Sequence, residues 1–190
     1  MIELLKELDI MLFLFFNGIH SAAGDFIMYW LSHKFIWIPL YIFLLYLLFR
    51  FYGKKTLLLL VMVALLITIS DQVSVHCFKN VFQRLRPCHE PSLEGLVYTL
   101  GRCGGKYSFI SSHASNSFAI AVFMALLLWD KMRTFSIVMI VWAALVSYSR
   151  IYLGVHYPAD IICGAIAGSV EAFIVYRLWL WLKTKIWKET

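Results

Sequence analysis

Three side chains that can bind an anion, attack an electrophile or carry a proton stand close together in the segment 149–160. The segment reads Ser-Arg-Ile-Tyr-Leu-Gly-Val-His-Tyr-Pro-Ala-Asp between two apolar runs, and the three are Arg150, His156 and Asp160. Ionisable groups are costly beside a bilayer core, so the cluster indicates a functional site. If a helix begins near Tyr157, Asp160 can orient the His156 imidazole and leave one nitrogen free for attack. The alternative is a helix start at a membrane surface, with Arg150 reaching headgroups and Asp160 as cap.

A second polar cluster, Lys-Asn-Val-Phe-Gln-Arg-Leu-Arg-Pro, runs from Lys79 to Pro87. Lys79 and Arg86 are seven residues apart, about two helical turns, so they are expected to share one helix face. Pro87 disfavours the helical conformation at Arg86, which would turn the guanidinium inward. The alternative for these cations alone is a basic belt at the membrane interface.

A third cluster, Ser-Phe-Ile-Ser-Ser-His-Ala-Ser-Asn, begins at position 108 and precedes an apolar run. It is typical of a helix start in which Ser111 or Ser112 is the cap. A helix N-terminus offers unpaired N–H groups and the positive end of the helix dipole, which suits a phosphate. His113 would lie in the first turn, beside whatever binds there, although a buried, hydrogen-bonded histidine is the alternative.

The composition predicts what must position these clusters. Of 190 residues, 62% are hydrophobic and 15% are charged, and the mean hydropathy is +0.78. These values exclude an ordinary soluble domain and predict an all-α, polytopic transmembrane bundle formed by one domain, 1–190. Five strong spans are expected, and the shorter apolar segments within 1–34 would be interfacial or half-helices, or a sixth crossing. The five spans are 35–52, 56–78, 111–129, 134–153 and 158–182.

Basic residues predict the orientation of the bundle. They lie at the turns near 54 and 132 and in the tail from 183, and five spans put these places on one side, which would be cytoplasmic. The loop 79–110 would then lie on the periplasmic side with the 150–158 turn. This loop is also basic, against the usual trend, and binding an anion is the simplest purpose for such a cluster.

The three clusters together supply Lys79, Arg86 and Arg150, a helix N-terminus and two histidines. This set suits phosphoryl transfer, in which the cations hold phosphate oxygens, one histidine attacks and the other protonates the leaving oxygen. A magnesium site would need clustered carboxylates, which are missing here. Zinc on the two histidines is disfavoured by the surrounding cations. We therefore expect no metal and no cofactor.

At these residues the sequence resembles the type-2 phosphatidic-acid phosphatase superfamily, which includes the vanadium haloperoxidases, and in particular its membrane-bound bacterial branch. The family motifs are K-x6-R-P, P-S-G-H and S-R-x5-H-x3-D. The first and third are matched in full, whereas the second has Ile110 in place of proline and Ser112 in place of glycine. The resemblance covers roughly 55–175.

The resemblance implies a role for each matched residue. His156 would be the nucleophile that forms a phosphohistidine, Asp160 its orienting partner and His113 the general acid. The implied phosphate ligands are Lys79, Arg86, Arg150, Ser111 and the backbone N–H of Ser112. Serine at 112 restricts the backbone where the family has glycine but adds a hydroxyl, and we expect the loop to tolerate it.

Four residues outside the motifs also carry predictions. Asp71 lies eight residues before Lys79 and is expected to support a basic residue of the site. Cys88 and Cys103 share the outer loop, where an oxidising periplasm would favour a disulfide over two free thiols. Glu171, within the last span, is expected to face the bundle interior.

The sequence therefore predicts a multi-pass lipid phosphate phosphatase of a bacterial inner membrane, with its site facing the periplasm. Undecaprenyl diphosphate is the leading substrate. Lipid A phosphate, phosphatidylglycerol phosphate and phosphatidic acid are the alternatives, because the motifs recognise phosphate rather than lipid tails. A transporter of anionic lipids and a catalytically silent membrane protein remain as other classes. The expected partners are the lipid substrate and the bilayer, not nucleic acid, and the sequence makes no prediction of oligomeric state.

Overall fold

The computed structural model describes residues 2–187, and within that range the chain is helical without a β-strand. This confirms the all-α class. The named α-helices are α1 (Ile2–Asn17), α2 (Ala22–Ser32), α3 (Ile38–Tyr52), α4 (Thr56–Gln72), α5 (Asn80–Phe82), α6 (Ser112–Leu128), α7 (Arg133–Tyr152) and α8 (Pro158–Ile186). A π-helical segment, Val73–Lys79, joins α4 to α5, and short 3₁₀ turns lie at Lys34–Trp37, Gly53–Lys55, Pro87–His89 and Pro91–Leu93.

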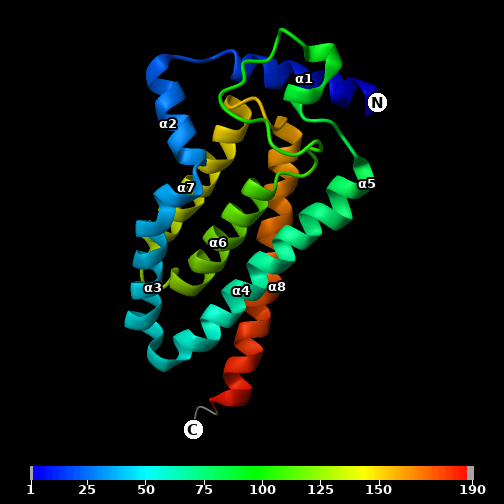
Figure 1. Cartoon of the computed structure of the whole chain (residues 1–190). Helices are drawn as coiled ribbons and strands as arrows, with labels where there is room; N and C mark the ends of the chain where they lie inside the picture. Colours follow the sequence, from blue (N-terminus) through cyan, green and yellow to red (C-terminus); the bar gives the residue numbers. More distant parts are fainter. Residues whose placement is uncertain (1, 188–190) are drawn as a thin grey trace.

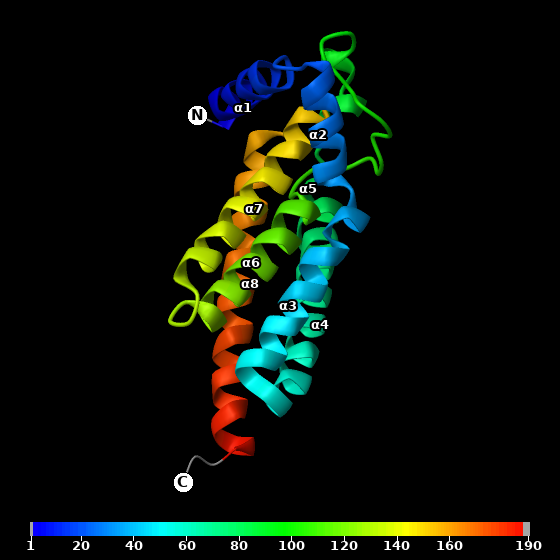
Figure 2. The same cartoon turned by 90° about the vertical axis from the view of Figure 1, so that its left-hand side faces the viewer.

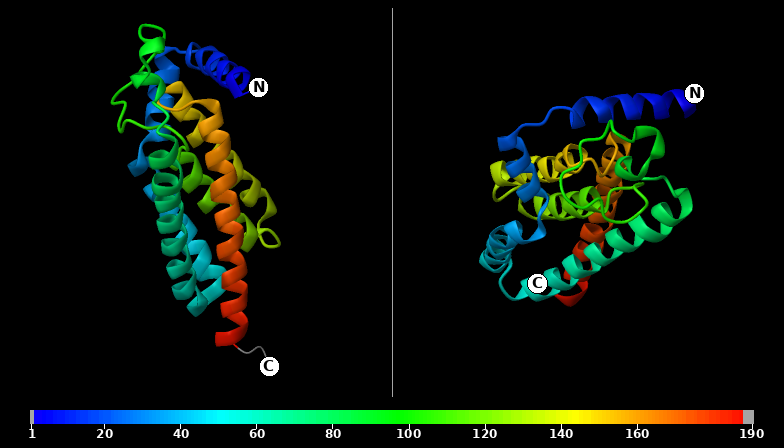
Figure 3. Two further views of the ribbon diagram at one scale, coloured as in Figure 1. Left: turned by 90° about the vertical axis from the view of Figure 1, so that its right-hand side faces the viewer. Right: turned by 45° about the horizontal axis from the view of Figure 1, so that its top comes forward.

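The helices α3, α4, α6, α7 and α8 form an elongated bundle (Figures 1 and 2). Helix α1 lies across one end of it, and α2 descends along one side toward α3 (Figures 1 and 3). The long loop between α5 and α6 covers the same end as α1 (Figure 1). The three polar clusters therefore lie at one end of the bundle, beneath α1 and this loop.

The expected number of five or six strong spans is not confirmed. Three helical stretches are long and apolar enough to cross a membrane: Lys34–Phe82, α7 and α8. The first contains both α3 and α4, which are joined by the turn at Gly53–Lys55. Helix α6 has 17 residues and falls just short of that length, while α1 and α2 would form one broken span, bent by 116°.

Helices α6 and α8 pack closely because α8 carries glycine where they touch. A Cβ atom on Gly164 would lie 2.7 Å from the carbonyl oxygen of Ser111, and one on Gly168 would lie 2.0 Å from that of Ser115. Glycines four residues apart allow two helix backbones to approach directly. This contact places the beginning of α6 against the first turns of α8.

The interior of the bundle is apolar, with a core of buried leucine, phenylalanine, methionine and tryptophan side chains from α3, α4, α6, α7 and α8. Glu171 is 9% exposed within it, which confirms that this residue faces inward. The end of the bundle that carries the clusters is fastened by Asn17, whose side-chain amide donates to the carbonyl oxygens of Tyr98 and Tyr152 at 2.8 and 3.0 Å. Asn17 thereby ties α1 to the long loop and to the end of α7.

Candidate active site

The turn between α7 and α8 holds the first pair of reactive side chains. Helix α8 begins at Pro158 with Tyr157 as its N-cap, as the sequence predicted. The Asp160 carboxylate accepts the backbone N–H of Tyr157 at 3.0 Å and lies 3.3 Å from Nδ1 of His156. Asp160 is 0% exposed and His156 is 1% exposed. Because the carboxylate engages Nδ1, Nε2 of His156 is the nitrogen available for attack.

His156 is held in its neutral form. Its burial, and then the charges of Arg86, Arg150 and Lys79, keep the pKa of His156 well below its ordinary value. A neutral imidazole has the free lone pair that a nucleophile requires. The same influences place all three predicted cations within electrostatic reach of His156, although they come from three separate parts of the chain.

The beginning of α6 contacts the beginning of α8. Ser111 is the N-cap of α6, since its Oγ accepts the backbone N–H of Ala114 at 3.4 Å. The backbone N–H of Ser111 donates to the carbonyl oxygen of Asp160 at 3.1 Å. The hydroxyl of Ser111 thus acts as a helix cap, and its hydrogen remains free to donate to a phosphate oxygen.

Lys79 is positioned by Ser112, one of the two residues that depart from the second family motif. Nζ of Lys79 donates to Oγ of Ser112 at 2.6 Å. Lys79 is the last residue of the π-helical segment, and such segments are frequent at functional sites because they shift a side chain out of the α-helical register. The hydroxyl of Ser112 therefore gives the lysine a partner that glycine could not supply.

The prediction that Lys79 and Arg86 share a helix face is wrong. The helix ends at Phe82, and Gln83 takes a left-handed conformation with φ 47°, so the chain turns away before Arg86. The outer loop accordingly begins after Phe82 rather than at residue 79. The prediction that Arg86 leaves the helical conformation is confirmed, since its φ and ψ are −70° and 152°.

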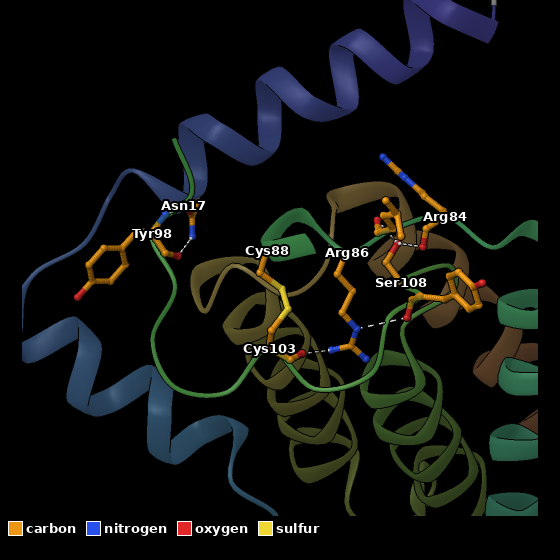
Figure 4. Close-up of a disulfide and its surroundings, with 9 residues drawn as sticks. Asn17, Arg84, Arg86, Cys88, Tyr98, Cys103 and Ser108 are labelled. Carbon is orange, nitrogen blue, oxygen red and sulfur yellow. Dashed lines mark hydrogen bonds between the residues drawn. A yellow bond between two sulfur atoms is a disulfide. The ribbon is translucent and has the colours of Figure 1, made fainter. Parts of the chain in front are cut away.

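The arginine is instead brought to the site by its own loop. The N–H of Arg86 donates to the carbonyl oxygen of Lys106 at 3.2 Å, so the chain near 86 pairs with the chain near 106. Its guanidinium donates from Nη1 to the carbonyl oxygen of Cys103 at 2.7 Å and from Nε to that of Tyr107 at 3.3 Å (Figure 4). Burial lowers the pKa of Arg86, and the Asp160 carboxylate opposes this effect.

Cys88 and Cys103 are joined by a disulfide in the structure, with their Cα atoms 6.2 Å apart (Figure 4). Cys88 lies two residues beyond Arg86, and the carbonyl of Cys103 accepts from that arginine. The disulfide therefore joins the two parts of the loop that lie next to Arg86. With His89, these sulfurs are also the one group among residues 2–187 that could offer three metal-ligand atoms close together. Sulfurs joined in a disulfide are not thiolates, so this group does not fit a metal site.

Arg150 and His113 complete the set of predicted groups. Nη1 of Arg150 contacts Oγ of Ser32, while its Nε has no hydrogen-bond partner among the described residues. His113 is exposed in the first turn of α6. It lies within electrostatic reach of Arg150 and Lys79. A buried guanidinium N–H without a partner is a ready donor to an oxyanion.

Asp71 is exposed at the end of α4. Its charge acts on Lys79, but no hydrogen bond or ion pair joins the two within residues 2–187. Support of the lysine by Asp71 stays a prediction.

Sequence reasoning missed two charged residues that contact the site. Nη1 of Arg84 lies 3.3 Å from Oδ1 of Asp160, and Nη2 of Arg84 lies 2.7 Å from Oδ2 of Asp9 in α1. The only feature of the sequence that pointed to this contact was Asp9, a carboxylate inside the apolar run of α1. Its partner could not be inferred, because about 75 residues separate each acid from the arginine.

With this geometry in place, the chain can be compared with known proteins. The sequence pattern of the PAP2 superfamily matches residues 55–184. The chain is 42% identical to a lipid A 4'-phosphatase of Bacteroides thetaiotaomicron over 93% of its own length and 79% of the relative's. It is 37% identical to a lipid A 4'-phosphatase of Porphyromonas gingivalis, over 96% and 78% of the two lengths. An undecaprenyl-diphosphatase of Sulfolobus acidocaldarius is 31% identical over 90% and 78%.

Two solved structures share the fold. The chain matches Aquifex aeolicus LpxE with a TM-score of 0.66 and 24% identity, covering 90% of this chain and 95% of that one. It matches a PAP2-type phosphatidylglycerolphosphate phosphatase of Bacillus subtilis with a TM-score of 0.73 and 20% identity, covering 98% and 89%. The predicted family and the predicted hydrolase of lipid phosphates are confirmed at this level. The chain belongs to the PAP2 superfamily.

Proposed function

We propose that the chain hydrolyses a lipid phosphate through a covalent intermediate on His156. Lys79, Arg86 and Arg150 bind the phosphate oxygens with the N-terminus of α6. Nε2 of His156 attacks phosphorus, and His113 donates a proton to the oxygen that leaves with the lipid. Water then attacks the phosphohistidine and gives a proton to His113, which restores both histidines and releases phosphate. No metal takes part in these proposed reaction steps.

The observation that carries this proposal is the buried His156–Asp160 pair, which lies within electrostatic reach of three cations and touches the N-cap of α6. A carboxylate on Nδ1 orients the ring and stabilises the positive charge that develops when Nε2 attacks. Fixed cations that need no rearrangement stabilise the negative charge on the phosphoryl oxygens in the transition state. The bundle lets a lipid keep its tails in the bilayer while its phosphate reaches this end.

We propose lipid A phosphate as the substrate class. The most similar relatives cited above are 42% and 37% identical and are named lipid A 4'-phosphatases, whereas an undecaprenyl-diphosphatase is 31% identical. These comparisons favour the alternative over the leading expectation of undecaprenyl diphosphate. Because the phosphate ligands are common to both, the difference must come from surfaces around the site that meet the headgroup and tails.

We further propose that α3, α4, α6, α7 and α8 each cross a bacterial inner membrane, with the site on the periplasmic side and α1 lying in that interface. The turns at the opposite end carry Lys54, Lys131 and Arg133, as expected of a cytoplasmic face. Reaction of single cysteines near residues 54 and 102 with a membrane-impermeant thiol reagent tests this orientation. Labelling at 54 in intact cells would contradict it.

A substrate panel tests the function. Purified protein with EDTA present is given lipid A, undecaprenyl diphosphate, phosphatidylglycerol phosphate and phosphatidic acid, and phosphate release is measured. We expect the highest kcat/KM with lipid A and no release by His156→Ala. Preference for undecaprenyl diphosphate would overturn the substrate, and absence of release from every lipid would overturn the enzyme.

A further inference from the structure

Helix α1 lies outside the matched family region and carries none of the motifs, yet it contacts Tyr157 and Ala159, which lie between His156 and Asp160. Asp9, in the middle of α1, is 8% exposed although it is a carboxylate. A buried charge is costly unless it is paired and hydrogen-bonded, so its partners reveal what it does. Both of its oxygens are engaged with groups of the site end.

One oxygen of Asp9 holds the start of α8. Oδ1 accepts the backbone N–H of Ala159 at 2.8 Å. Ala159 follows Pro158 in the first turn and immediately precedes Asp160, so this bond fixes the backbone beside the orienting carboxylate. Phe13, one turn further along α1, packs edge-on against Tyr157 with ring centroids 5.4 Å apart. Helix α1 therefore supplies a cap and an apolar contact to the turn that carries His156.

The other oxygen of Asp9 acts through Arg84. The guanidinium lies between two carboxylates, with Nη2 2.7 Å from Asp9 Oδ2 and Nη1 3.3 Å from Asp160 Oδ1. The guanidinium carbon of Arg84 lies 3.7 Å from the centroid of the Tyr157 ring, so the guanidinium also lies over that ring. A planar guanidinium can make two such contacts from fixed directions, which an ammonium group cannot. Arg84 thus contacts one oxygen of Asp160, while the other oxygen lies beside His156.

We propose that Asp9 and Arg84 are positioning residues of the reaction, which hold the Asp160 carboxylate in the orientation that aligns His156. The contacts form one chain, Asp9–Arg84–Asp160–His156, from α1 to the proposed nucleophile. Neither Asp9 nor Arg84 is proposed to touch the phosphate. This inference rests on the proposed function of His156.

The first test distinguishes the roles of the two carboxylate oxygens of Asp9. Asp9→Asn keeps an amide oxygen for Ala159 but removes the charge that holds Arg84, whereas Asp9→Ala removes both. We expect Asp9→Asn to lower kcat about tenfold, the lower end of the effect of removing an outer partner of a reactive group, with KM unchanged. Glu7→Gln, an equal loss of charge at an exposed position of α1, is the control and should match wild type.

The second test addresses Arg84 directly. Arg84→Gln should lower kcat about 10- to 100-fold, and Arg84→Lys should recover part of the loss, because it restores the charge but not the fork. The double variant Asp9→Asn with Arg84→Gln should be no slower than Arg84→Gln alone, since both act on one chain. Thermal unfolding in detergent is measured for each, so that a change in kcat is compared among folded proteins.

The outcomes are distinguishable. A wild-type kcat in both Asp9→Asn and Arg84→Gln would overturn this inference while leaving the phosphatase intact. A rise in KM at constant kcat in either variant would also overturn it, because it would mean a role in binding. Wild-type protein without phosphatase activity would instead overturn the proposed function itself.

Discussion

Both ends of the bundle carry lysines and arginines, but the two sets contact different chemical groups. At the end away from the site, the cations lie over aromatic rings. Nζ of Lys131 is 4.9 Å from the centroid of the Tyr52 ring, and the guanidinium carbon of Arg133 is 5.0 Å from that of Trp129. These lysine and arginine side chains are exposed. They have the arrangement of an interface anchor, in which charge stays near water or headgroups.

At the site end the cations contact oxygen atoms, and Arg84 does so in addition to lying over the Tyr157 ring. Lys79 donates to a serine hydroxyl, Arg86 donates to two backbone carbonyls, and Arg84 lies between two carboxylates. Each contact fixes the direction of the charge. A cation with a fixed direction can stabilise a transition state without rearranging, whereas a cation on an exposed ring cannot. What distinguishes the two ends is therefore the partner of each cation rather than the number of cations.

The sharpest test replaces one arginine at each end of the bundle by alanine and compares the two variants. Arg150→Ala should reduce kcat/KM about 10²- to 10³-fold, as expected when one donor to the developing oxyanion is removed. Arg133→Ala should leave kcat/KM unchanged. Phosphate release from the best lipid of the panel measures both. Equal effects of the two substitutions would remove the distinction between the ends.

The disulfide should account for part of the rigidity of the site end. Cys88→Ser should cost about 3 kcal/mol of unfolding free energy on a loop-entropy estimate, because the bridge closes a loop with a sequence separation of 15. It should also raise KM, since the loop presents Arg86. Cys77→Ser, at an exposed free cysteine, is the control. Mass spectrometry that finds Cys88 and Cys103 both as free thiols in the native protein would contradict the bridge.

The pH dependence should reveal the cations around His156. A lowered pKa keeps the imidazole neutral at and below pH 6.5, so activity is lost only as the pH falls through that lowered value. Arg86→Gln removes one of the charges that lower the pKa of His156. The acid limb of log kcat/KM should then move to higher pH, by about one unit for one nearby charge. Arg102→Gln, an exposed cation of the same loop, should leave the limb in place.

The smallest effect is expected at the far end. Lys131→Ala removes one exposed cation–π contact and should cost no more than about 1 kcal/mol of unfolding free energy. Thermal unfolding in detergent measures it, with activity unchanged. A large loss of activity would mean that this end contributes to catalysis.

The sequence alone predicted the helices because hydrophobic runs and turn residues specify them locally. The start of α8 beside Pro158 and the cap at Ser111 follow from the same local rules. The prediction that Lys79 and Arg86 share a helix face was wrong, because the left-handed conformation at Gln83 ends the helix early. That conformation is fixed by the fold rather than by residue type.

The contacts of α1 could not be predicted from the sequence. Asp9 and Ala159 are 150 residues apart, and no periodic pattern relates them. Periodicity identifies the side of a helix that is buried but not the group that it meets. The family motifs supplied the site residues one by one, whereas the positioning of Asp160 by Arg84 required coordinates.

The central claim is that His156 becomes phosphorylated during turnover. Wild-type protein is mixed with lipid A carrying a radioactive phosphate group, quenched in base, where phosphohistidine survives, and digested for mass spectrometry. We predict transient label on the peptide that contains His156, and neither label nor phosphate release in His156→Ala. Steady phosphate release from wild-type protein without label on that peptide, or continued release by His156→Ala, would contradict the account.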